Sequence, residues 1–244
     1  MRAVVCGANG AMGRLIREIL GSDVVGCVSI DGENGVPKTF EELGAVDADV
    51  VIDFSHHSAA PDVLRYAEAI GAAAVIGTTG HTPEEKALIK DAAERIPVFF
   101  SGNMSLGVAV LSALTKKAAA VLGGTYDIEI VEMHHNQKLD APSGTALMLA
   151  DAAKAGLSFE PEYTYDRHTR RQKRGKQEIG IASLRGGTVV GEHSVYFAGE
   201  QEVITLSHSA GSRSVFAAGA LTAAAFLQGK PAGLYTMEDI IGAI

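Results

Sequence analysis

Cysteine is scarce in this chain, and the residue pattern of a metal centre is absent around it. The two cysteines, Cys6 and Cys27, both lie inside apolar runs that predict β-strands. Neither is spaced from other cysteines or histidines as zinc ligands are. Isolated thiols in apolar runs are typical of buried, free cysteines in a reducing compartment. We therefore expect free thiols and no bound metal.

A long apolar segment and an excess of positive charge are also missing. A membrane-spanning helix needs about 18 or more consecutive apolar residues, and no such run is present. The first residues lead straight into a predicted strand, without the features of a signal peptide. The formal net charge of −8 disfavours nucleic acid as a partner. These absences predict a cytoplasmic globular protein that contacts neither a membrane nor nucleic acid.

One short segment departs from the acidic average. Its basic residues are Arg167, His168, Arg170, Arg171, Lys173, Arg174 and Lys176. Such a run is compatible with a mobile, solvated surface loop. It is equally the composition of a lid that attracts an anionic substrate or cofactor, and both interpretations stay open.

The first 103 residues alternate β-rich runs with helical stretches. The predicted strands are Ala3–Cys6, Val24–Val28, Val50–Phe54, Ala73–Ile76 and Val98–Phe100. The predicted helices are 11–20, 57–70 and 83–95, with a short one at 40–43. The strands are continuously apolar, as strands buried on both faces of a parallel sheet are. This alternation predicts a doubly wound α/β domain of the Rossmann type.

The pattern changes after residue 103. Helices are predicted at 105–122 and 144–155, and strands at 126–133, 178–184, 193–197 and 202–207. This order predicts an α+β C-terminal domain with a mixed sheet. A last helix at about 213–227 ends before Gly229 and Pro231, a common stop signal. We expect domain one to be 1–103 with about 213–244 returning to it, and domain two to be 104–212.

The first predicted strand runs directly into a glycine-rich turn and then a helix. The turn is Gly7-Ala8-Asn9-Gly10-Ala11-Met12-Gly13. Glycines at this spacing let the backbone approach a pyrophosphate, which the helix N-terminus attracts. A glycine-rich turn without a ligand is the alternative, but the strand before and the helix after favour a dinucleotide.

Asp31 ends the second predicted strand, where a carboxylate binds the hydroxyls of the adenosine ribose. A carboxylate there repels a 2′-phosphate, Gly32 follows it, and the nearest candidate cation is Lys38. We therefore expect NADH to be preferred, with NADPH possible.

Two further loops follow consecutive strands, at the edge where such sheets bind ligands. They are Gly77-Thr78-Thr79-Gly80 and Ser101-Gly102-Asn103-Met104. Their N–H and hydroxyl groups suit a nicotinamide carboxamide or ribose, although either loop alone could be an ordinary turn.

The segment His134-His135-Asn136-Gln137-Lys138-Leu139-Asp140-Ala141-Pro142-Ser143-Gly144-Thr145 contains the densest cluster of reactive groups. It joins a predicted strand to a predicted helix, and such loops commonly carry chemistry. Proton donors beside a helix N-terminus suit an acidic substrate that must be protonated. Ser143 and Asp140 could equally be helix caps. No third ligand accompanies the histidine pair, so a metal site is disfavoured.

These segments together resemble the 4-hydroxy-tetrahydrodipicolinate reductase (dihydrodipicolinate reductase) family over nearly the whole chain. The matching segments are GANGAMG at 7–13, DFS at 53–55, GTTG at 77–80, SGNMSLG at 101–107, EMHHNQKLDAPSGTA at 132–146, RGGTVVGEHSVYFAG at 185–199, SHSAGSR at 207–213 and GLYTMEDI at 233–240. The resemblance implies NAD(P)H-dependent reduction of a cyclic dicarboxylate on the diaminopimelate route to lysine, with hydride delivered to ring C4.

The resemblance also implies roles for single residues. His134 matches a proton donor and acceptor, and Lys138 a proton donor. The substrate-binding positions are His135, Gly144 and Thr145. The cofactor positions are Gly7, Ala8, Asn9, Gly10, Ala11, Met12, Asp31, Gly77, Thr78, Thr79, Ser101, Gly102, Asn103 and Met104. The family further implies a homotetramer built through the sheet of the second domain.

Two departures from the family pattern bear on the cofactor. Met104 stands where many members have an aromatic residue, and Gly32 where some have an arginine. The second departure supports weaker use of NADPH. Arg185, Gly186 and Gly187 are further candidate substrate contacts.

Two other functions fit parts of the chain. One is a different nicotinamide reductase, acting on another imino or oxo dicarboxylate, which the segment 134–145 disfavours. The other is a non-catalytic NAD sensor or assembly protein, because a fold does not determine a function. A sensor has no need for a proton donor beside a carboxylate pocket.

Overall fold

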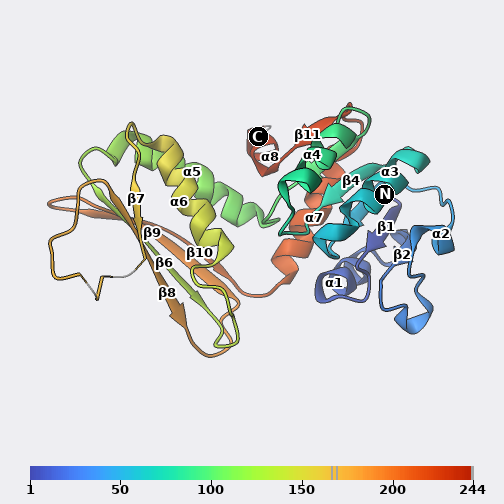
Figure 1. Cartoon of the computed structure of the whole chain (residues 1–244), viewed down its shortest axis with the longest axis horizontal. Coiled ribbons are helices and arrows are strands. Elements are labelled where there is room, and N and C mark those ends of the chain that lie inside the picture. The colour runs from blue at the N-terminus through green and yellow to red at the C-terminus, as the bar shows by residue number, and fades with distance from the viewer. Residues whose placement is uncertain (166, 169, 243–244) are drawn as a thin grey trace. The chain divides into compact units, whose positions relative to one another are not determined.

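The computed structural model describes residues 1–165, 167–168 and 170–242, and it divides into two compact units. Unit 1 is Met1–Leu106 together with the chain from Arg213 onward, and unit 2 is Gly107–Ser212. Figure 1 shows the elements of both units. Each unit has its own sheet and its own core.

Unit 1 is built on a six-stranded parallel sheet with the order β11-β5-β4-β3-β1-β2. The strands are β1 (Ala3–Cys6), β2 (Val24–Val28), β3 (Val50–Asp53), β4 (Ala73–Ile76), β5 (Pro97–Phe100) and β11 (Gly233–Tyr235). Every residue of β1 and β3 is buried. The register pairs Val4 with Val51 and Ile52 with Val75. The apolar runs of the sequence are therefore the two-sided interior of the sheet.

Helices cover both faces of this sheet. They are α1 (Ala11–Leu20), α2 (Phe40–Leu43), α3 (Ala60–Ile70), α4 (Pro83–Ala92), α7 (Ser214–Leu227) and α8 (Met237–Gly242). Alternate strand residues such as Val4 and Ile76 form one core with α3 and α4. The helices α1 and α7 pack against each other, and Phe226 of α7 contacts Phe99 of β5. The fold is thus a doubly wound α/β domain.

The order of the strands reverses at β1. The chain crosses from β1 to its neighbour β2 on one side and then to β3 on the other. In parallel sheets, ligands bind at the carboxyl ends of the strands where this reversal occurs. The loops that follow β1 and β3 therefore flank the expected cofactor position.

Unit 2 has a mixed five-stranded sheet with the order β10-β9-β6-β8-β7. Its strands are β6 (Asp127–His134), β7 (Glu162–Thr164), β8 (Glu178–Arg185), β9 (Gly191–Ala198) and β10 (Val203–Ala210). Strand β6 is parallel to β8 and antiparallel to β9. Helices α5 (Leu106–Leu122) and α6 (Gly144–Gly156) cover one face, where side chains of both helices share a core with inward residues of the sheet (Figure 1).

This architecture confirms the predicted fold class, and most boundaries agree within a few residues. The sequence did not predict β7, β11 or α8. The predicted helix 57–70 begins as a 3₁₀ turn at His57–Ala59. Among the described residues, no helix has both the length and the apolar character needed to cross a membrane.

One burial prediction is wrong. Both cysteines are free, but only Cys6 is buried, and Cys27 is partly exposed. Cys27 belongs to β2, which ends the sheet and has a neighbouring strand on one side. Burial nevertheless raises the pKa of the Cys6 thiol to about 12, so this thiol stays protonated.

Candidate active site

The glycine turn after β1 is packed so tightly that side chains are excluded from it. A Cβ on Gly7, whose φ is +77°, would lie 2.4 Å from the carbonyl oxygen of Phe54. A Cβ on Gly13 would lie 2.2 Å from the oxygen of Gly7. Helix α1 begins after Gly10, and no side chain caps it. No side-chain cap therefore accepts a hydrogen bond from the first N–H groups of α1, which leaves them suited to bind a pyrophosphate.

Asp31 is tied to this turn by Asn9. Asn9 Nδ2 donates to Asp31 Oδ1 at 2.6 Å and to the carbonyl oxygen of Glu33 at 3.1 Å. The bond from Asn9, followed by the backbone N–H of Glu33, lowers the pKa of the Asp31 carboxyl. Asp31 is exposed and ionised beside the glycine turn.

Lys38 lies against the same position. A Cβ on Gly32, whose φ is +63°, would lie 2.5 Å from Lys38 Cε. Gly32 therefore leaves room for the lysine side chain to pass beside Asp31. The sequence could name Lys38 as the nearest cation, but not this contact.

The loops after β3 and β4 are joined by a buried carboxylate. Asp53 is fully buried, and its Oδ2 accepts a hydrogen bond from Thr78 Oγ1 at 2.7 Å. Its Oδ1 accepts from Ser55 Oγ at 2.5 Å. The Thr78 hydroxyl is thus committed to Asp53, whereas Thr79 is exposed. Asp53 therefore holds the two loops together.

The loop after β5 is held by its own side chains. Ser101 Oγ donates to the carbonyl oxygen of Asn103 at 2.8 Å, and Asn103 Oδ1 accepts from Ser105 N at 2.9 Å. Gly102 is exposed, but Met104 is only 2% exposed and its oxygen lies where a Cβ on Gly219 would be. The Met104 side chain is therefore buried, and its backbone packs against Gly219 of α7.

In unit 2, His134 ends β6 beside a carboxylate that is fully buried. His134 is 8% exposed, and its Nδ1 lies 2.6 Å from Glu132 Oε2. Arg185, which pairs with His134 in the register of β8, donates to both oxygens of Glu132 at 2.8 Å. Burial opposes ionisation of Glu132, but the bonds from Arg185 and His134 lower the pKa of its carboxyl to about 2. An ionised carboxylate thus lies against His134 at neutral pH.

Lys138 lies on the loop beyond His134 and has an acidic partner. Its Nζ lies 2.7 Å from Asp140 Oδ1, and this pairing lowers the pKa of the Asp140 carboxyl. Asp140 therefore holds the lysine and does not cap the helix. The loop is anchored by backbone bonds from Asn136 to Gly187 and from Gly186 to His134. His135 is partly exposed on it.

Helix α6 begins at the other end of this loop. Ser143 caps it, since Ser143 Oγ accepts from Ala146 N at 3.2 Å. The same oxygen lies 3.0 Å from Nε2 of the buried His193. Gly144 is exposed and Thr145 partly exposed in the first turn. The α6 N-terminus, His134 and Lys138 thus belong to one connected loop in unit 2.

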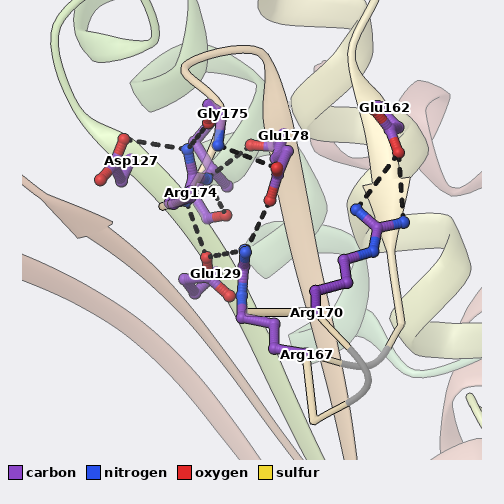
Figure 2. Close-up of polar contacts among 9 residues, drawn as sticks. Asp127, Glu129, Glu162, Arg167, Arg170, Arg174, Gly175 and Glu178 are labelled. Carbon is purple, nitrogen blue, oxygen red and sulfur yellow. Dashed lines mark hydrogen bonds and ion pairs between the residues drawn. The ribbon is translucent and has the colours of Figure 1, made fainter. Parts of the chain in front are cut away.

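Three arginines of the basic segment, Arg167, Arg170 and Arg174, are paired with carboxylates, as Figure 2 shows. Arg174 pairs with Asp127 and Glu129, each at 2.9 Å, and Arg167 with Glu129 at 2.9 Å and Glu178 at 2.7 Å. These carboxylates lie at the amino-terminal ends of β6 and β8, whereas His134 and Arg185 end the same parallel strands.

Arg170 also has a carboxylate partner, Glu162, at 3.4 Å. The three arginines therefore tie this largely exposed segment to carboxylates of unit 2, and those of β6 and β8 lie at the strand ends opposite His134. Arg171, Lys173 and Lys176 are exposed on the same segment, and Thr169 lies outside the described residues.

Sequence reasoning missed two members of the site. They are Glu132 on β6 and His193 on β9. A signal for Glu132 was present, because it follows Ile128 and Ile130 on the inward face of a strand, where a carboxylate is costly. Arg185, a candidate substrate contact, donates hydrogen bonds to Glu132 and to the carbonyls of Leu184 and Asp140.

Comparison with known proteins covers the whole chain. Residues 1–104 match the family model "Dihydrodipicolinate reductase, N-terminus", and residues 107–241 match "Dihydrodipicolinate reductase, C-terminus". The 4-hydroxy-tetrahydrodipicolinate reductase of Caldanaerobacter subterraneus subsp. tengcongensis is 50% identical, with 99% of this chain and 98% of the relative covered. The enzyme of the same name from an Anaeromyxobacter species is 47% identical, with 99% and 98% covered.

A solved structure is also similar. The dipicolinate-bound dihydrodipicolinate reductase from Paenisporosarcina sp. TG-14 superposes with a TM-score of 0.76 at 23% identity, and 97% of each chain is covered. At this identity the likeness concerns the fold.

Proposed function

The chain belongs to the dihydrodipicolinate reductase family, and from this premise we propose that it reduces 4-hydroxy-tetrahydrodipicolinate with a nicotinamide cofactor on the diaminopimelate route to lysine. The observation that carries the proposal for the site is the loop of unit 2 that connects His134, Lys138 and the N-terminus of α6. Two proton donors and an anion-binding backbone suit a small dicarboxylate that must be protonated.

The residues of unit 1 fit the implied cofactor. Gly7 and Gly13 leave a cradle that any Cβ would fill, and α1 begins without a side-chain cap. We assign the pyrophosphate to Gly7–Met12 and the adenosine ribose to Asp31. Thr79, Gly102 and the backbones of their loops would hold the nicotinamide side. The bound cofactor supplies the hydride that reaches C4 of the substrate ring.

The two donors of unit 2 neutralise the charge that reduction creates. The C4 hydroxyl must first leave as water, which conjugates C4 with the ring nitrogen. Hydride added to C4 then leaves negative charge on that nitrogen, and a nearby acid or cation stabilises the charge. Lys138 can donate a proton, and His134 can donate or relay one. General acid assistance of this kind is typically worth about two to four orders of magnitude in rate.

The carboxylates of the substrate are assigned to the start of α6. The N–H groups of Gly144 and Thr145 lie in its first turn, where the helix attracts anions. His135, on the same loop, is assigned to substrate binding as well. Ser143 holds the end of the helix in place through its cap.

NADH is proposed as the preferred cofactor. The ionised Asp31 would lie against the ribose hydroxyls and repel a 2′-phosphate. Lys38 beside Gly32 is the cation that would keep NADPH usable. The two free thiols are consistent with a cytoplasmic enzyme.

A homotetramer is the proposed assembly, formed through the sheet face of unit 2 opposite α5 and α6. The outward residues of this face include Val203, which is 60% exposed, and Leu184, which is 50% exposed. Exposed apolar side chains of this kind, here beside polar ones such as Thr205 and Ser207, are compatible with an interface between copies.

The experiment that tests the function follows NADH oxidation with freshly generated substrate. The wild type is expected to oxidise NADH rapidly, and Lys138→Ala to lower kcat about 100-fold or more while leaving the KM for NADH unchanged. Lys154→Ala is the matched control, because Lys154 also pairs with a carboxylate of unit 2, Glu160. Turnover by Lys138→Ala at the wild-type rate would contradict the assignment of Lys138 as a proton donor.

The same assay decides the cofactor. A higher kcat/KM with NADH than with NADPH is expected. Lys38→Ala should lower only the NADPH value, by up to about fivefold, as the loss of one exposed ion pair would. A wild type that prefers NADPH would contradict the argument from Asp31. A folded wild type inactive with both cofactors would favour a sensor or another substrate.

A further inference from the structure

Glu132 takes part in four hydrogen bonds, with three residues of unit 2. Its Oε2 faces Nδ1 of His134 at 2.6 Å, and its Oε1 accepts from the backbone N–H of Ser143 at 3.1 Å. Arg185 donates one hydrogen bond at 2.8 Å to each oxygen. A single carboxylate therefore touches the proposed acid and the cap of the proposed anion-binding helix.

Burial of an ionised carboxylate at position 132 is energetically unfavourable. Glu132 is 0% exposed and lies on the inward face of β6, where the preceding inward residues are Ile128 and Ile130. A buried carboxylate costs several kcal/mol unless its charge and lone pairs are matched. Packing alone would be served by another apolar residue. The carboxylate occurs instead at the end of the strand, one inward position before His134.

The geometry specifies how His134 carries its protons. A carboxylate oxygen at 2.6 Å from Nδ1 can only accept, so Nδ1 must hold a hydrogen. The other ring nitrogen is then the one that exchanges a proton. A Cβ on Gly191 would lie 3.0 Å from Nε2, so glycine leaves that side of the ring uncrowded.

We propose that Glu132 is the positioning residue of this active site, which holds His134 in the Nδ1–H form with Nε2 directed to the substrate and at the same time fixes the start of α6 through Ser143. Arg185 keeps the carboxylate ionised by its paired hydrogen bonds. When Nε2 gives up its proton, the ring is already in its neutral Nδ1–H form and does not have to reorient. The inference rests on the function proposed above.

The first test needs no variant. In protein labelled with ¹⁵N-histidine and kept above the pH at which imidazoles are protonated, the His134 ring is expected to carry its hydrogen on Nδ1. The His134→Gln spectrum assigns the signal. A ring with its hydrogen on Nε2 would overturn the proposal, whatever the enzyme reduces.

The second test is kinetic. Glu132→Gln keeps the shape but loses the charge, and kcat is expected to fall about 100-fold or more, with a smaller rise in the Kd for pyridine-2,6-dicarboxylate. Glu132→Asp keeps the charge at a shorter reach and should recover part of kcat. In Glu132→Gln, His134 should show a mixture of ring forms. Wild-type kcat in Glu132→Gln would overturn the proposal.

A matched control lies at the opposite end of the same sheet. Glu178 is 8% exposed, accepts from Arg167 at 2.7 Å and from the backbone N–H of Gly175 at 2.8 Å (Figure 2). Glu178→Gln makes the same chemical change and should lower stability without lowering kcat. Equal losses of kcat in both variants would reduce Glu132 to a structural role. An inactive wild type would contradict the proposed function and leave the ring-form test standing.

Discussion

At the scale of the residue, two neighbouring histidines of unit 2 have opposite surroundings. The rings of His134 and His193 lie 5.2 Å apart, centroid to centroid. His134 faces the Glu132 carboxylate, whereas His193 Nδ1 is buried without a hydrogen-bond partner. Burial, followed by the nearby His134, lowers the pKa of His193 to about 4. His193 is therefore neutral at physiological pH and serves as a neutral partner of Ser143.

This difference predicts an acid-sensitive stability. In the unfolded chain His193 is protonated near its ordinary pKa of 6.5. In the folded protein its pKa is about 4, so it is protonated only at lower pH. The free energy of unfolding should thus fall as the pH drops between these values, and His193 contributes up to roughly 3 kcal/mol of that fall. His193→Gln should flatten the profile in urea titrations at fixed protein concentration. A variant with the wild-type slope would contradict the assignment.

At the scale of the element, helix α4 begins with a reciprocal cap between two side chains and the backbone. Thr82 Oγ1 accepts from Glu85 N at 3.2 Å, and Glu85 Oε2 accepts from Thr82 N at 2.8 Å. This capping box, with Pro83 in the first turn, satisfies N–H groups that the helix cannot bond itself.

Loss of that cap should cost stability and not activity. Thr82→Ala is expected to lower the free energy of unfolding by about 1 kcal/mol with kcat unchanged. Thr125→Ala provides the comparison, because Thr125 Oγ1 donates to the carbonyl oxygen of Leu122 at the end of α5 and satisfies no N–H group at the start of a helix. Chemical unfolding of the two variants measures the difference, and equal stabilities would show that the box contributes nothing.

Elements with one clear physical signature are the ones that could be predicted from sequence. Strands such as β1 and β4 are short apolar runs between glycines and helices, and α1 follows a glycine turn, so their bounds agree with the structure. β7 and β11 have three residues each, too few for a period to be visible, and they form because a neighbouring strand edge accepts them.

The site was predictable to the extent that its residues lie in one segment. His134, Lys138 and the start of α6 follow each other in sequence, and their roles stay predictions until the assays above are made. Glu132 lies two residues earlier on the strand, and Arg185 and His193 come from β8 and β9. Their convergence depends on the pairing of strands far apart in the chain, which no local pattern specifies.

At the scale of the whole molecule, the proposed tetramer should depend on the sheet face of unit 2 opposite α5 and α6. Sedimentation should give four times the chain mass of 25.4 kDa. Val203→Glu places a charge on that face and should dissociate the assembly. Val121→Glu is the matched control, because Val121 is 76% exposed at the end of α5. A monomeric wild type, or equal behaviour of the two variants, would contradict the proposal.

The return of the chain to unit 1 after Ser212 has a consequence for synthesis. Unit 2 is one continuous stretch, so a ribosome delivers all of it before α7 and β11 exist. The sheet of unit 1 lacks its β11 edge, and the Phe99 side chain lacks its contact with Phe226, until the last part of the chain emerges. The nucleotide-binding half is therefore translated first but completed last, and a truncated product would expose an unfinished apolar sheet to quality-control proteases.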